Sequence, residues 1–446
     1  MMSLAQASKV LNGTMSGESV DFSAVSIDTR SLKSGDLYAA LHGDRFDGHD
    51  YIEQAKQAGA VAAIVHKDVN TCLPVIKVEN TRKALGELAA AWRQAFCGKV
   101  AAITGSNGKT TVKEMLALIA AKQGSVLSTR GNFNNDIGLP LTLLRIKHED
   151  FAVIEMGANH LGEISGLTNI TRPDVALINN AGQSHLEGFG SLKGVAQAKG
   201  EIFQGLSDDG IGVVNKDDEF SEYWCALLGN KKRIEFSMKD VTADVYGEWH
   251  QTESGGNLKV NVCGDELSVN LKVHGMHNAM NALAAIAVTE ALSIDHKYIA
   301  QALNEFEAVK GRLNFHKVSE NLTVIDDTYN ANPASLLAGI NVLKELPGEH
   351  WLVLGDMGEL GDDEQSIHFN AGTEAKKSGV ARLLAIGESS VHAAQAFGEK
   401  AKVFKDKEEL ISFIRQHQSG KLGVLIKGSR FMHMEQIVES LVKETT

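Results

Sequence analysis

The sequence predicts an α/β protein with three domains. A chain of 446 residues is long enough for about three domains of roughly 150 residues each. Short apolar runs alternate with helical patterns over most of its length, and this rhythm is typical of parallel sheets that helices cover on both faces. One run leads into the loop TGSNGKTT, at 104–111, which opens a helix. Changes in pattern place the three domains at 1–97, 98–310 and 311–446.

The first domain is predicted to end in a helix that links it to the second. The stretch GHDYIEQAKQAGAVAAIVH predicts a helix followed by a buried strand at 60–65. A helical pattern at 82–96 predicts the linking helix.

The second domain is predicted to hold a mostly parallel sheet with an antiparallel hairpin. Strict alternation of apolar and polar residues on both sides of Gly264-Asp265 predicts the hairpin. Apolar runs of a few residues between helical patterns predict the buried parallel strands. These predicted strands lie at 100–104, 151–156, 174–179 and 210–215, and the helices at 110–122 and 278–292.

The third domain is predicted to be a separate, Rossmann-like α/β sheet. Its pattern of apolar runs and intervening helices begins near Gly311, and an amphipathic helix at 436–446 closes the chain with its charges towards solvent. The predicted strands lie at 322–326, 351–355, 383–387 and 423–428.

The composition and the net charge argue against several classes of function and location. The formal net charge of -12 leaves no basic surplus to neutralise phosphates, so no nucleic-acid partner is expected. No apolar run approaches the ~18 residues of a membrane span, and the start, MMSLAQASKVLNG, lacks the pattern of a signal peptide. The four cysteines are scattered, as expected in a reducing compartment. We therefore expect a cytoplasmic protein without membrane insertion, and a monomer.

The loop at 104–111 is predicted to bind the phosphates of a nucleotide. It departs from the common GxxxxGK[ST] pattern because Ile103 stands where the first glycine would be. Glycines at the end of a strand still let backbone N–H groups converge at a helix N-terminus, where the helix dipole favours anions. Lys109 is expected to reach the outer phosphates and Thr110 to bind Mg²⁺. The alternative is an ordinary strand-to-helix turn.

Two further polar residues follow buried strands and are predicted to join Thr110 around the metal. Glu155 closes the run FAVIE, and His185 comes a few residues after the run DVALIN. In open parallel sheets, ligands bind outside the carboxyl ends of the strands, so these side chains are expected to converge there. For His185 the alternative is an ordinary structural histidine, since the chain has 16 of them.

A GTPase is an alternative function for a protein with this phosphate loop, but the sequence disfavours it. The stretch NKDD at 215–218 matches the NKxD pattern that reads guanine, and it follows a buried strand. The only DxxG between the loop and this stretch is Asp209 to Gly212, which leaves no room for a switch region ordered by the γ-phosphate.

Several stretches resemble the Mur ligase family, the ATP-dependent amide-forming enzymes of peptidoglycan assembly. The resemblance rests on TGSNGKTT, GNFNNDIGLPLTLL, EMGANHLGEI, NNAGQSHLEGFGS, GMHNAMNALAA, DDTYNANPAS and LGDMGELG, which span all three predicted domains. It implies the activity that joins D-alanyl-D-alanine to UDP-N-acetylmuramoyl-tripeptide, through an acyl phosphate. The main alternative is the ligase that adds the third amino acid, but its DNPR stretch does not occur here.

The resemblance also implies roles for individual residues. It implies that the stretch DTRSLKSGDLYAALHG belongs to a uridine-nucleotide module and that Lys199 matches a lysine which relatives carry as a carbamate. Catalytic residues are then Lys109, Glu155, His185 and Lys199. Mg²⁺ is implied at Thr110, Glu155 and His185. ATP is implied at Gly105, Ser106, Asn107, Gly108, Lys109, Thr110, Thr111, His277, Asn278, Asn281, Arg312 and Asp326. Substrate is implied at Thr29, Arg30, Asn134, Asn135, Asp327, Tyr329, Asn330 and Asn332.

On the residues alone, two other classes stay open. A P-loop ATPase could drive a conformational change instead of forming a bond, and it would turn over without acceptor and amine. A nucleotide-binding scaffold would bind ATP and release no phosphate at all. Product analysis separates both from a ligase.

Overall fold

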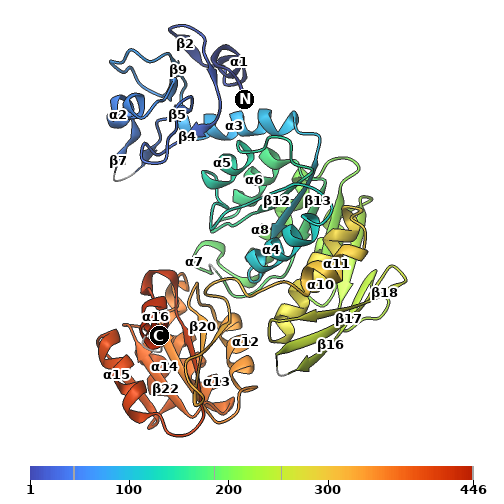
Figure 1. Cartoon of the computed structure of the whole chain (residues 1–446), viewed down its shortest axis with the longest axis vertical. Helices are drawn as coiled ribbons and strands as arrows, with labels where there is room; N and C mark the ends of the chain where they lie inside the picture. Colours follow the sequence, from blue (N-terminus) through green and yellow to red (C-terminus); the bar gives the residue numbers. More distant parts are fainter. Residues whose placement is uncertain (44–45, 185, 253, 444–446) are drawn as a thin grey trace.

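The computed structural model describes residues 1–43, 46–184, 186–252 and 254–443. Three large sheets follow one another along the chain, and each has its own helices, while two small two-stranded sheets lie in the first domain (Figure 1). The first domain lies at one end of the elongated molecule and the third at the other, with the second between them (Figure 1). Within the described ranges, no helix is both long and apolar enough to span a membrane.

The first domain is built on a five-stranded sheet with the order β2-β9-β8-β5-β4. Only β2 runs antiparallel to its neighbour. The strands are β1 (Met2–Ser3), β2 (Thr14–Ser16), β3 (Asp21–Phe22), β4 (Val25–Ser26), β5 (Leu37–Ala39), β6 (His42–Gly43), β7 (Phe46–Asp47), β8 (Ala62–Val65) and β9 (Val75–Lys77). The helices are α1 (Leu4–Val10), η1 (Gly48–Tyr51), α2 (Ile52–Gln57) and α3 (Thr81–Gln94).

The second domain has a nine-stranded sheet with the order β11-β12-β10-β13-β14-β15-β16-β17-β18. Its strands are parallel from β11 to β16, and β16, β17 and β18 are antiparallel. The strands are β10 (Lys99–Thr104), β11 (Val126–Ser128), β12 (Phe151–Glu155), β13 (Val175–Ile178), β14 (Ile211–Asn215), β15 (Lys232–Ser237), β16 (Val245–Thr252), β17 (Gly255–Val262) and β18 (Asp265–Leu271). The helices are α4 (Lys109–Ala120), α5 (Gly138–Leu143), α6 (Glu163–Thr171), α7 (Leu186–Phe189), α8 (Leu192–Gly200), η2 (Glu201–Gly205), α9 (Ser221–Leu228), α10 (Met276–Ala291) and α11 (Lys297–Leu303).

The third domain has a six-stranded sheet with the order β19-β20-β24-β21-β22-β23, in which only β19 is antiparallel. The strands are β19 (Asn314–Lys317), β20 (Leu322–Asp327), β21 (Glu349–Gly355), β22 (Arg382–Ile386), β23 (Ala401–Phe404) and β24 (Leu422–Lys427). The helices are α12 (Pro333–Leu343), η3 (Gly361–Asp363), α13 (Glu364–Lys377), α14 (Ser390–Phe397), α15 (Lys407–His417), η4 (Arg430–Met432) and α16 (Glu435–Lys443).

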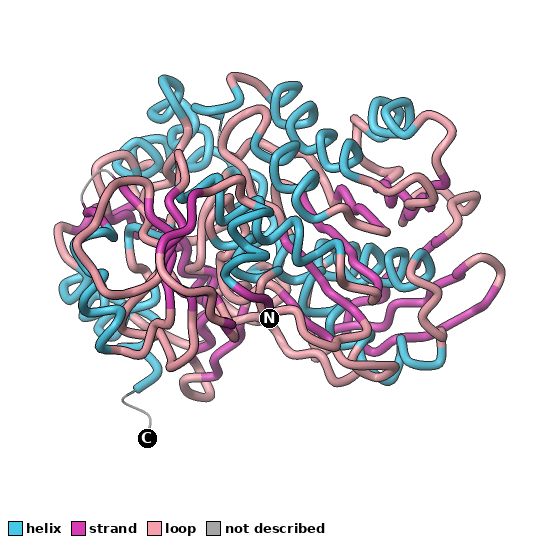
Figure 2. The backbone as a smooth tube through the Cα atoms, turned by 90° about the horizontal axis from the view of Figure 1, so that it is seen from above, coloured by secondary structure: helices cyan, strands magenta, loops and turns pink. Residues whose placement is uncertain are grey.

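The central sheet is buried on both faces, which explains the continuous apolar runs in its strands. Along β10, Val100 and Ala102 pack into one hydrophobic cluster, with α3, α6 and α8. The alternate residues Ala101 and Ile103 pack into a second cluster, with α4 and α10. Successive side chains of a strand point to opposite faces, so helices must cover both faces of this sheet. In Figure 2, helices lie beside the strands of the sheets in the view from above.

Most elements predicted from the sequence are confirmed, and the missed ones are strands with weak apolar patterns. The hairpin β17–β18 is antiparallel as predicted, with its turn at Cys263-Gly264, where both residues have positive φ. Strands that were not predicted are β1 to β7 and β9 in the first domain, β11, β15 and β16 in the second, and β19 and β23 in the third. The end of the predicted terminal helix, at 444–446, lies outside the described residues.

Arg93 fastens the linking helix α3 to the second domain. Its guanidinium is buried and donates hydrogen bonds to the carbonyl oxygens of Thr171 at 2.9 Å, Arg172 at 3.0 Å and Phe96 at 3.2 Å. One side chain therefore donates to carbonyl groups at the C-terminal end of α6 and to a carbonyl group just after its own helix, which would otherwise lack a hydrogen-bond donor.

We expect Arg93→Met to lower the free energy of unfolding by about 2–4 kcal/mol, because buried carbonyl groups would lose their donor. The measurement is urea unfolding followed by circular dichroism. Lys83→Met on the same helix is the matched control, since the Lys83 side chain is 77% exposed, and its effect should stay within about 0.5 kcal/mol. Equal effects of the two changes would contradict this role of Arg93.

Candidate active site

The phosphate loop follows β10 and leads directly into α4, as predicted. Gly108 precedes the helix with φ of 80°. A Cβ atom there would stand 2.1 Å from Oδ1 of Asn281 and 2.6 Å from Nδ2 of Asn179, so these contacts and the positive φ both favour glycine. The ammonium group of Lys109 folds back over the loop and donates to the carbonyl oxygen of Gly105 at 2.7 Å. Desolvation lowers the pKa of Lys109.

Asparagines that follow β13 hold the phosphate loop in place. The side chain of Asn179 donates to the carbonyl oxygen of Asn107 at 2.9 Å and to Oδ1 of Asn281 at 2.9 Å. The side chain of Asn180 donates to the same carbonyl at 3.1 Å and accepts from the N–H of Asn107 at 2.9 Å. Ser106 exchanges hydrogen bonds with the backbone of Gly182. The loop is therefore fixed by the neighbouring strand and by α10.

Thr110 and Glu155 meet at the carboxyl edge of the sheet. The Thr110 hydroxyl donates to Oε2 of Glu155 at 2.9 Å, and Asn134 donates to Oε1 of Glu155 at 2.8 Å. Nη2 of Arg312, from the start of the third domain, donates to the Thr110 hydroxyl at 3.0 Å. Glu155 is only 3% exposed, and its two carboxylate oxygens both accept hydrogen bonds. His185, which was predicted to join this group, lies outside the described residues.

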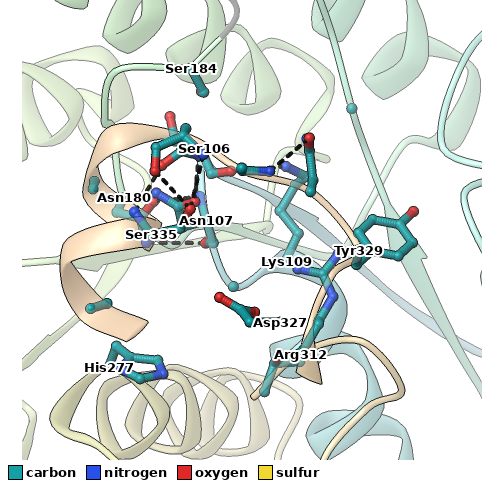
Figure 3. A pocket seen from close by; sticks show the side chains of 18 of the residues that line it. Ser106, Asn107, Lys109, Asn180, Ser184, His277, Arg312, Asp327, Tyr329 and Ser335 are labelled. Carbon is teal, nitrogen blue, oxygen red and sulfur yellow. Dashed lines mark hydrogen bonds between the residues drawn. The ribbon is translucent and has the colours of Figure 1, made fainter. Parts of the chain in front are cut away.

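The second and third domains enclose a cleft of about 550 Å³ beside this group. Lys109, Arg312 and Asp327 turn towards the same space, and the guanidinium of Arg312 lies 4.4 Å from the centre of the Tyr329 ring (Figure 3). The side chain of Asn332 donates to Oδ1 of Asn107 at 2.9 Å, across the cleft. The third domain therefore contacts the phosphate loop directly.

A buried ion pair supports the third-domain side of the cleft. The ammonium group of Lys427, at the end of β24, contacts the carboxylate of Asp327 and donates to the carbonyl oxygen of Asn330 at 3.0 Å. Lys427 is 1% exposed. It therefore fixes Asp327 at the end of β20 and the following segment before α12, which carries Tyr329, Asn330 and Asn332.

The start of α10 forms another part of the cleft wall. His277, Asn278 and Asn281 line it, and Asn281 connects to the phosphate loop through Asn179. Burial lowers the pKa of His277 to about 4, so its ring is neutral at neutral pH. Nε2 of this ring is buried and has no hydrogen-bond partner among the described residues.

Lys199, near the end of α8, is almost fully buried. Desolvation, with repulsion from the Lys109 charge, lowers the pKa of Lys199 to about 7. Its ammonium group lies 5.1 Å from the centre of the Phe189 ring. The nearby Glu201 carboxylate accepts from the backbone N–H groups of Gly162 and Ser165.

Some predicted site residues lie apart from the cleft. Thr29 and Arg30 belong to the first domain, where the Arg30 guanidinium pairs with Asp28 on the surface. Asp326 does not line the cleft, because the alternation along β20 turns it away from Asp327, and its carboxylate accepts from the Thr328 hydroxyl at 2.6 Å. The cleft-lining predicted residues are Ser106, Asn107, Gly108, Lys109, Thr111, Asn134, Asn135, Glu155, His277, Asn278, Asn281, Arg312, Asp327, Tyr329, Asn330 and Asn332.

Sequence reasoning did not single out Asn179, Asn180 or Lys427. Two consecutive asparagines directly after a buried strand are a usable signal, because side chains at that edge of a parallel sheet face the ligand. Lys427 gave no such signal, since its partner Asp327 lies 100 residues away.

The donor set fits a nucleotide with Mg²⁺. A hydroxyl and a carboxylate, Thr110 and Glu155, suit a hard cation that keeps few protein ligands and takes its others from phosphates and water. Within the described part of the chain, no three His, Cys, Asp or Glu side chains group as a metal site by themselves. The close approach of Asn281 and Asn179 at Gly108 leaves a cradle of backbone at a helix N-terminus, which suits phosphates.

Fold and site define a nucleotide-binding α/β protein whose phosphate loop faces a further domain across a cleft. Family models match all three parts of the chain: the Mur ligase family catalytic domain at 21–93, the Mur ligase middle domain at 103–289, and the Mur ligase glutamate ligase domain at 311–430. The chain belongs to the Mur ligase family.

Relatives over the full length carry the name of one member. The UDP-N-acetylmuramoyl-tripeptide–D-alanyl-D-alanine ligase of Escherichia coli is 42% identical, covering 100% of this chain and 99% of the relative. A crystal structure of MurF from Acinetobacter baumannii is 34% identical with a TM-score of 0.92, covering 98% of each chain. MurF ligase from Thermotoga maritima, solved in complex with ADP, is 29% identical with a TM-score of 0.85, covering 95% of this chain and 97% of that one.

We expect Lys427→Met to destabilise the protein by about 3–5 kcal/mol, because Asp327 would be left as an uncompensated buried charge. The measurement is urea unfolding of the single variants and of the double variant Lys427→Met/Asp327→Asn. The double variant should lose clearly less stability than the sum of the single changes, since the pair is coupled. Strict additivity would show that the contact contributes no coupling.

Proposed function

We propose that the protein is an ATP-dependent ligase that joins D-alanyl-D-alanine to the terminal carboxylate of UDP-N-acetylmuramoyl-tripeptide. The products are the UDP-linked pentapeptide, a precursor of peptidoglycan, together with ADP and phosphate. The observation that carries the proposal is the cleft in which Lys109 and Glu155 of the second domain face Arg312 and the wall of the third domain. The choice of substrates is supported by relatives of that name over the full length.

The reaction must turn a carboxylate, which is a poor electrophile, into a good one. Attack of a tripeptide carboxylate oxygen on the γ-phosphorus of ATP forms an acyl phosphate and releases ADP. The amine of D-alanyl-D-alanine, after losing a proton, then attacks the acyl carbon. The C–N bond forms, the bond between the acyl carbon and the phosphate oxygen breaks, and inorganic phosphate leaves.

Residues of this chain would position the phosphates and balance their charge. The loop N–H groups at the start of α4 bind phosphate oxygens, and Lys109 and Arg312 bring positive charge to the transferred group. Thr110 and Glu155 would hold Mg²⁺, which supplies further positive charge on the phosphates. Most of the barrier reduction in phosphoryl transfer comes from such positioning and electrostatic stabilisation.

The third domain would exclude water from the reacting groups. An acyl phosphate exposed to water hydrolyses, so the cleft must close around it. The hydrogen bond from Asn332 to Asn107 and that from Arg312 to Thr110 tie the third domain to the phosphate loop. These contacts support a closed arrangement during the reaction.

The three domains would divide the substrates between them. We assign 1–97 to the uridine end, with Thr29 and Arg30, 98–310 to ATP, and 311–446 to the incoming amine. Asp326, which does not line the cleft, would help to hold the residues that bind the nucleotide. All four cysteines are free thiols in the structure, which supports the cytoplasm as the compartment.

The test follows the oxygen atoms. Both oxygens of the tripeptide's terminal carboxylate are labelled with heavy oxygen, the full reaction is run, and the phosphate is weighed. One labelled oxygen per phosphate is expected, because a carboxylate oxygen attacks the γ-phosphorus and leaves with it. Label in AMP with release of pyrophosphate would indicate an adenylate instead. Unlabelled phosphate, or phosphate release without both acceptor and amine, would overturn the proposal in favour of an ATPase.

Lys109→Ala should lower kcat by about 100-fold or more, which corresponds to about 2.7 kcal/mol of barrier. The physical reason is the loss of the cation nearest the phosphate loop. The measurement is phosphate release coupled to a colour reaction, with all three substrates saturating. Lys122→Ala is the control, because Lys122 pairs with Glu305 on the surface beyond α4. A loss of less than about tenfold would exclude Lys109 as the main phosphoryl clamp.

Lys199 should act as a carbamate. An amine with a pKa near 7 is largely neutral at pH 8 and largely protonated at pH 6, and only the neutral form adds CO₂. We therefore expect added bicarbonate to raise turnover more at pH 8 than at pH 6. Lys199→Ala should regain part of its activity with short carboxylic acids. No response to either treatment would leave the unmodified amine as the working form.

A further inference from the structure

Glu155, the carboxylate proposed to bind Mg²⁺, is held at two points by the segment that follows β11. The Thr129 hydroxyl accepts from the backbone N–H of Glu155 at 3.0 Å, and the Asn134 side chain donates to the Glu155 carboxylate at 2.8 Å. The backbone N–H of Thr129 donates to the carbonyl oxygen of Val153 in β12 at 3.1 Å. The position of Glu155 therefore depends on where Thr129 is held.

Lys113 holds Thr129 from the neighbouring helix. Its ammonium group donates to the carbonyl oxygen of Thr129 at 2.6 Å. Lys113 lies in α4, one turn after Lys109 and three residues after Thr110. The helix that carries the phosphate loop therefore contacts Glu155 in two ways. Thr110 bonds to its carboxylate directly, and Lys113 acts on its backbone through Thr129.

The burial of Lys113 is costly, and this cost indicates a use for its hydrogen bond. The side chain of Lys113 is 0% exposed, whereas its ion-pair partner Glu114, at 2.8 Å, is 43% exposed. Taking an ammonium group out of water costs free energy, which a largely solvated partner compensates only in part. Methionine would fill a similar volume without that cost. We therefore look for the role of this lysine in its bond to Thr129.

Lys113 lies behind the cleft wall. Among the described residues, those that line the cleft include Glu155 and Asn134 but not Lys113 or Thr129. An effect of Lys113 on the site must therefore pass through Thr129 to Glu155. Groups behind a metal ligand set its orientation, and their loss typically weakens metal binding by about ten- to a hundredfold.

We propose that Lys113 is a positioning residue for the Mg²⁺ site: it fixes Thr129, and Thr129 orients Glu155 towards the metal. This inference rests on the proposed function, because it takes from it the nucleotide and Mg²⁺ at this site. Through these contacts α4 holds the phosphate loop, Thr110 and Glu155 in one arrangement before the nucleotide binds.

The test is the affinity for ADP, measured by titration calorimetry once with Mg²⁺ and once with EDTA. For Lys113→Met, we expect the affinity with Mg²⁺ to fall by about ten- to a hundredfold, because Glu155 loses its fixed orientation. The affinity in EDTA should stay within about twofold, since the phosphate loop keeps its own hydrogen-bond donors. A purely structural role of Lys113 would lower both affinities alike.

Two control variants separate the bond to Thr129 from the charge of the helix. Lys122→Met is the matched control, because Lys122 lies beyond the other end of α4 and pairs with Glu305. Glu114→Gln removes the ion pair and leaves the bond from Lys113 to Thr129 in place. Both variants should keep the Mg²⁺-dependent affinity of the wild type.

Variants of Thr129 test the second step of the proposal. Thr129→Val removes the hydroxyl that accepts from Glu155, so it should reproduce the loss seen with Lys113→Met. Thr129→Ser keeps a hydroxyl and should retain the wild-type affinity. The double variant Lys113→Met/Thr129→Val should lose little more than either single variant, because both changes act on the same contact.

The outcomes distinguish this inference from the proposed function. An unchanged affinity with Mg²⁺ in Lys113→Met or in Thr129→Val would overturn the role of Lys113, and so would equal losses with Mg²⁺ and with EDTA. If Lys113→Met does not fold, Thr129→Val and Thr129→Ser decide: equal affinities of these two would overturn the inference. A wild type that binds ADP with Mg²⁺ but does not ligate D-alanyl-D-alanine would overturn the proposed function alone.

Discussion

The hydroxyl of Thr110 is the point on which the geometry of the site depends. It donates to Glu155 and accepts from Arg312, so a carboxylate from one domain and a guanidinium from the next meet at a single oxygen. Thr110 is fixed in turn because it belongs to the first turn of α4, directly after the phosphate loop. The third domain is therefore held by a hydrogen bond to the same oxygen atom that would bind Mg²⁺. Nucleotide binding and domain position can therefore not vary independently.

Neutral amides hold the phosphate loop, and this choice has a physical reason. Asn179 and Asn180 bond to the backbone of Asn107 without bringing a charge close to the phosphates. A carboxylate in their place would repel the ligand, and a lysine or arginine would bind phosphate itself and compete with Lys109. The amides fix the backbone while the charge at the site comes from Lys109, Arg312 and Glu155. Position and charge are thus supplied by different side chains.

Much of this fold could be predicted because its main strands are buried on both faces. Residues 100–103 and 151–154 are apolar in succession, and the loop after 104 has glycines and a Lys-Thr pair at the helix start. Several of the strands that were missed are partly exposed, and the buried β5 has only three residues. In β23, for example, two of the four residues are exposed, so no apolar run marks it. The motif TGSNGKTT and the helix after it were predicted correctly because neighbouring residues in the sequence are enough to define them.

Contacts between distant parts of the chain could not be predicted in this way. The partners Lys427 and Asp327, or Asn332 and Asn107, are joined only by the fold. Only Asp327 of the two adjacent acids lines the cleft, because the two side chains point to opposite faces of β20. The sequence of two acids does not indicate which of them faces the cleft. The left-handed φ of Glu359 follows from the loop's surroundings and leaves no mark on the sequence LGDMGELG.

The hydrogen bond between Asn332 and Asn107 bears on how the two domains separate. Both side chains are uncharged, so this contact is not screened by salt and its strength does not depend on ionic strength. Each amide can exchange its partner for a water molecule at little net cost. The bond therefore guides the third domain to one orientation without holding it there. A domain that docks through such contacts can release a bulky product as readily as it encloses the substrates.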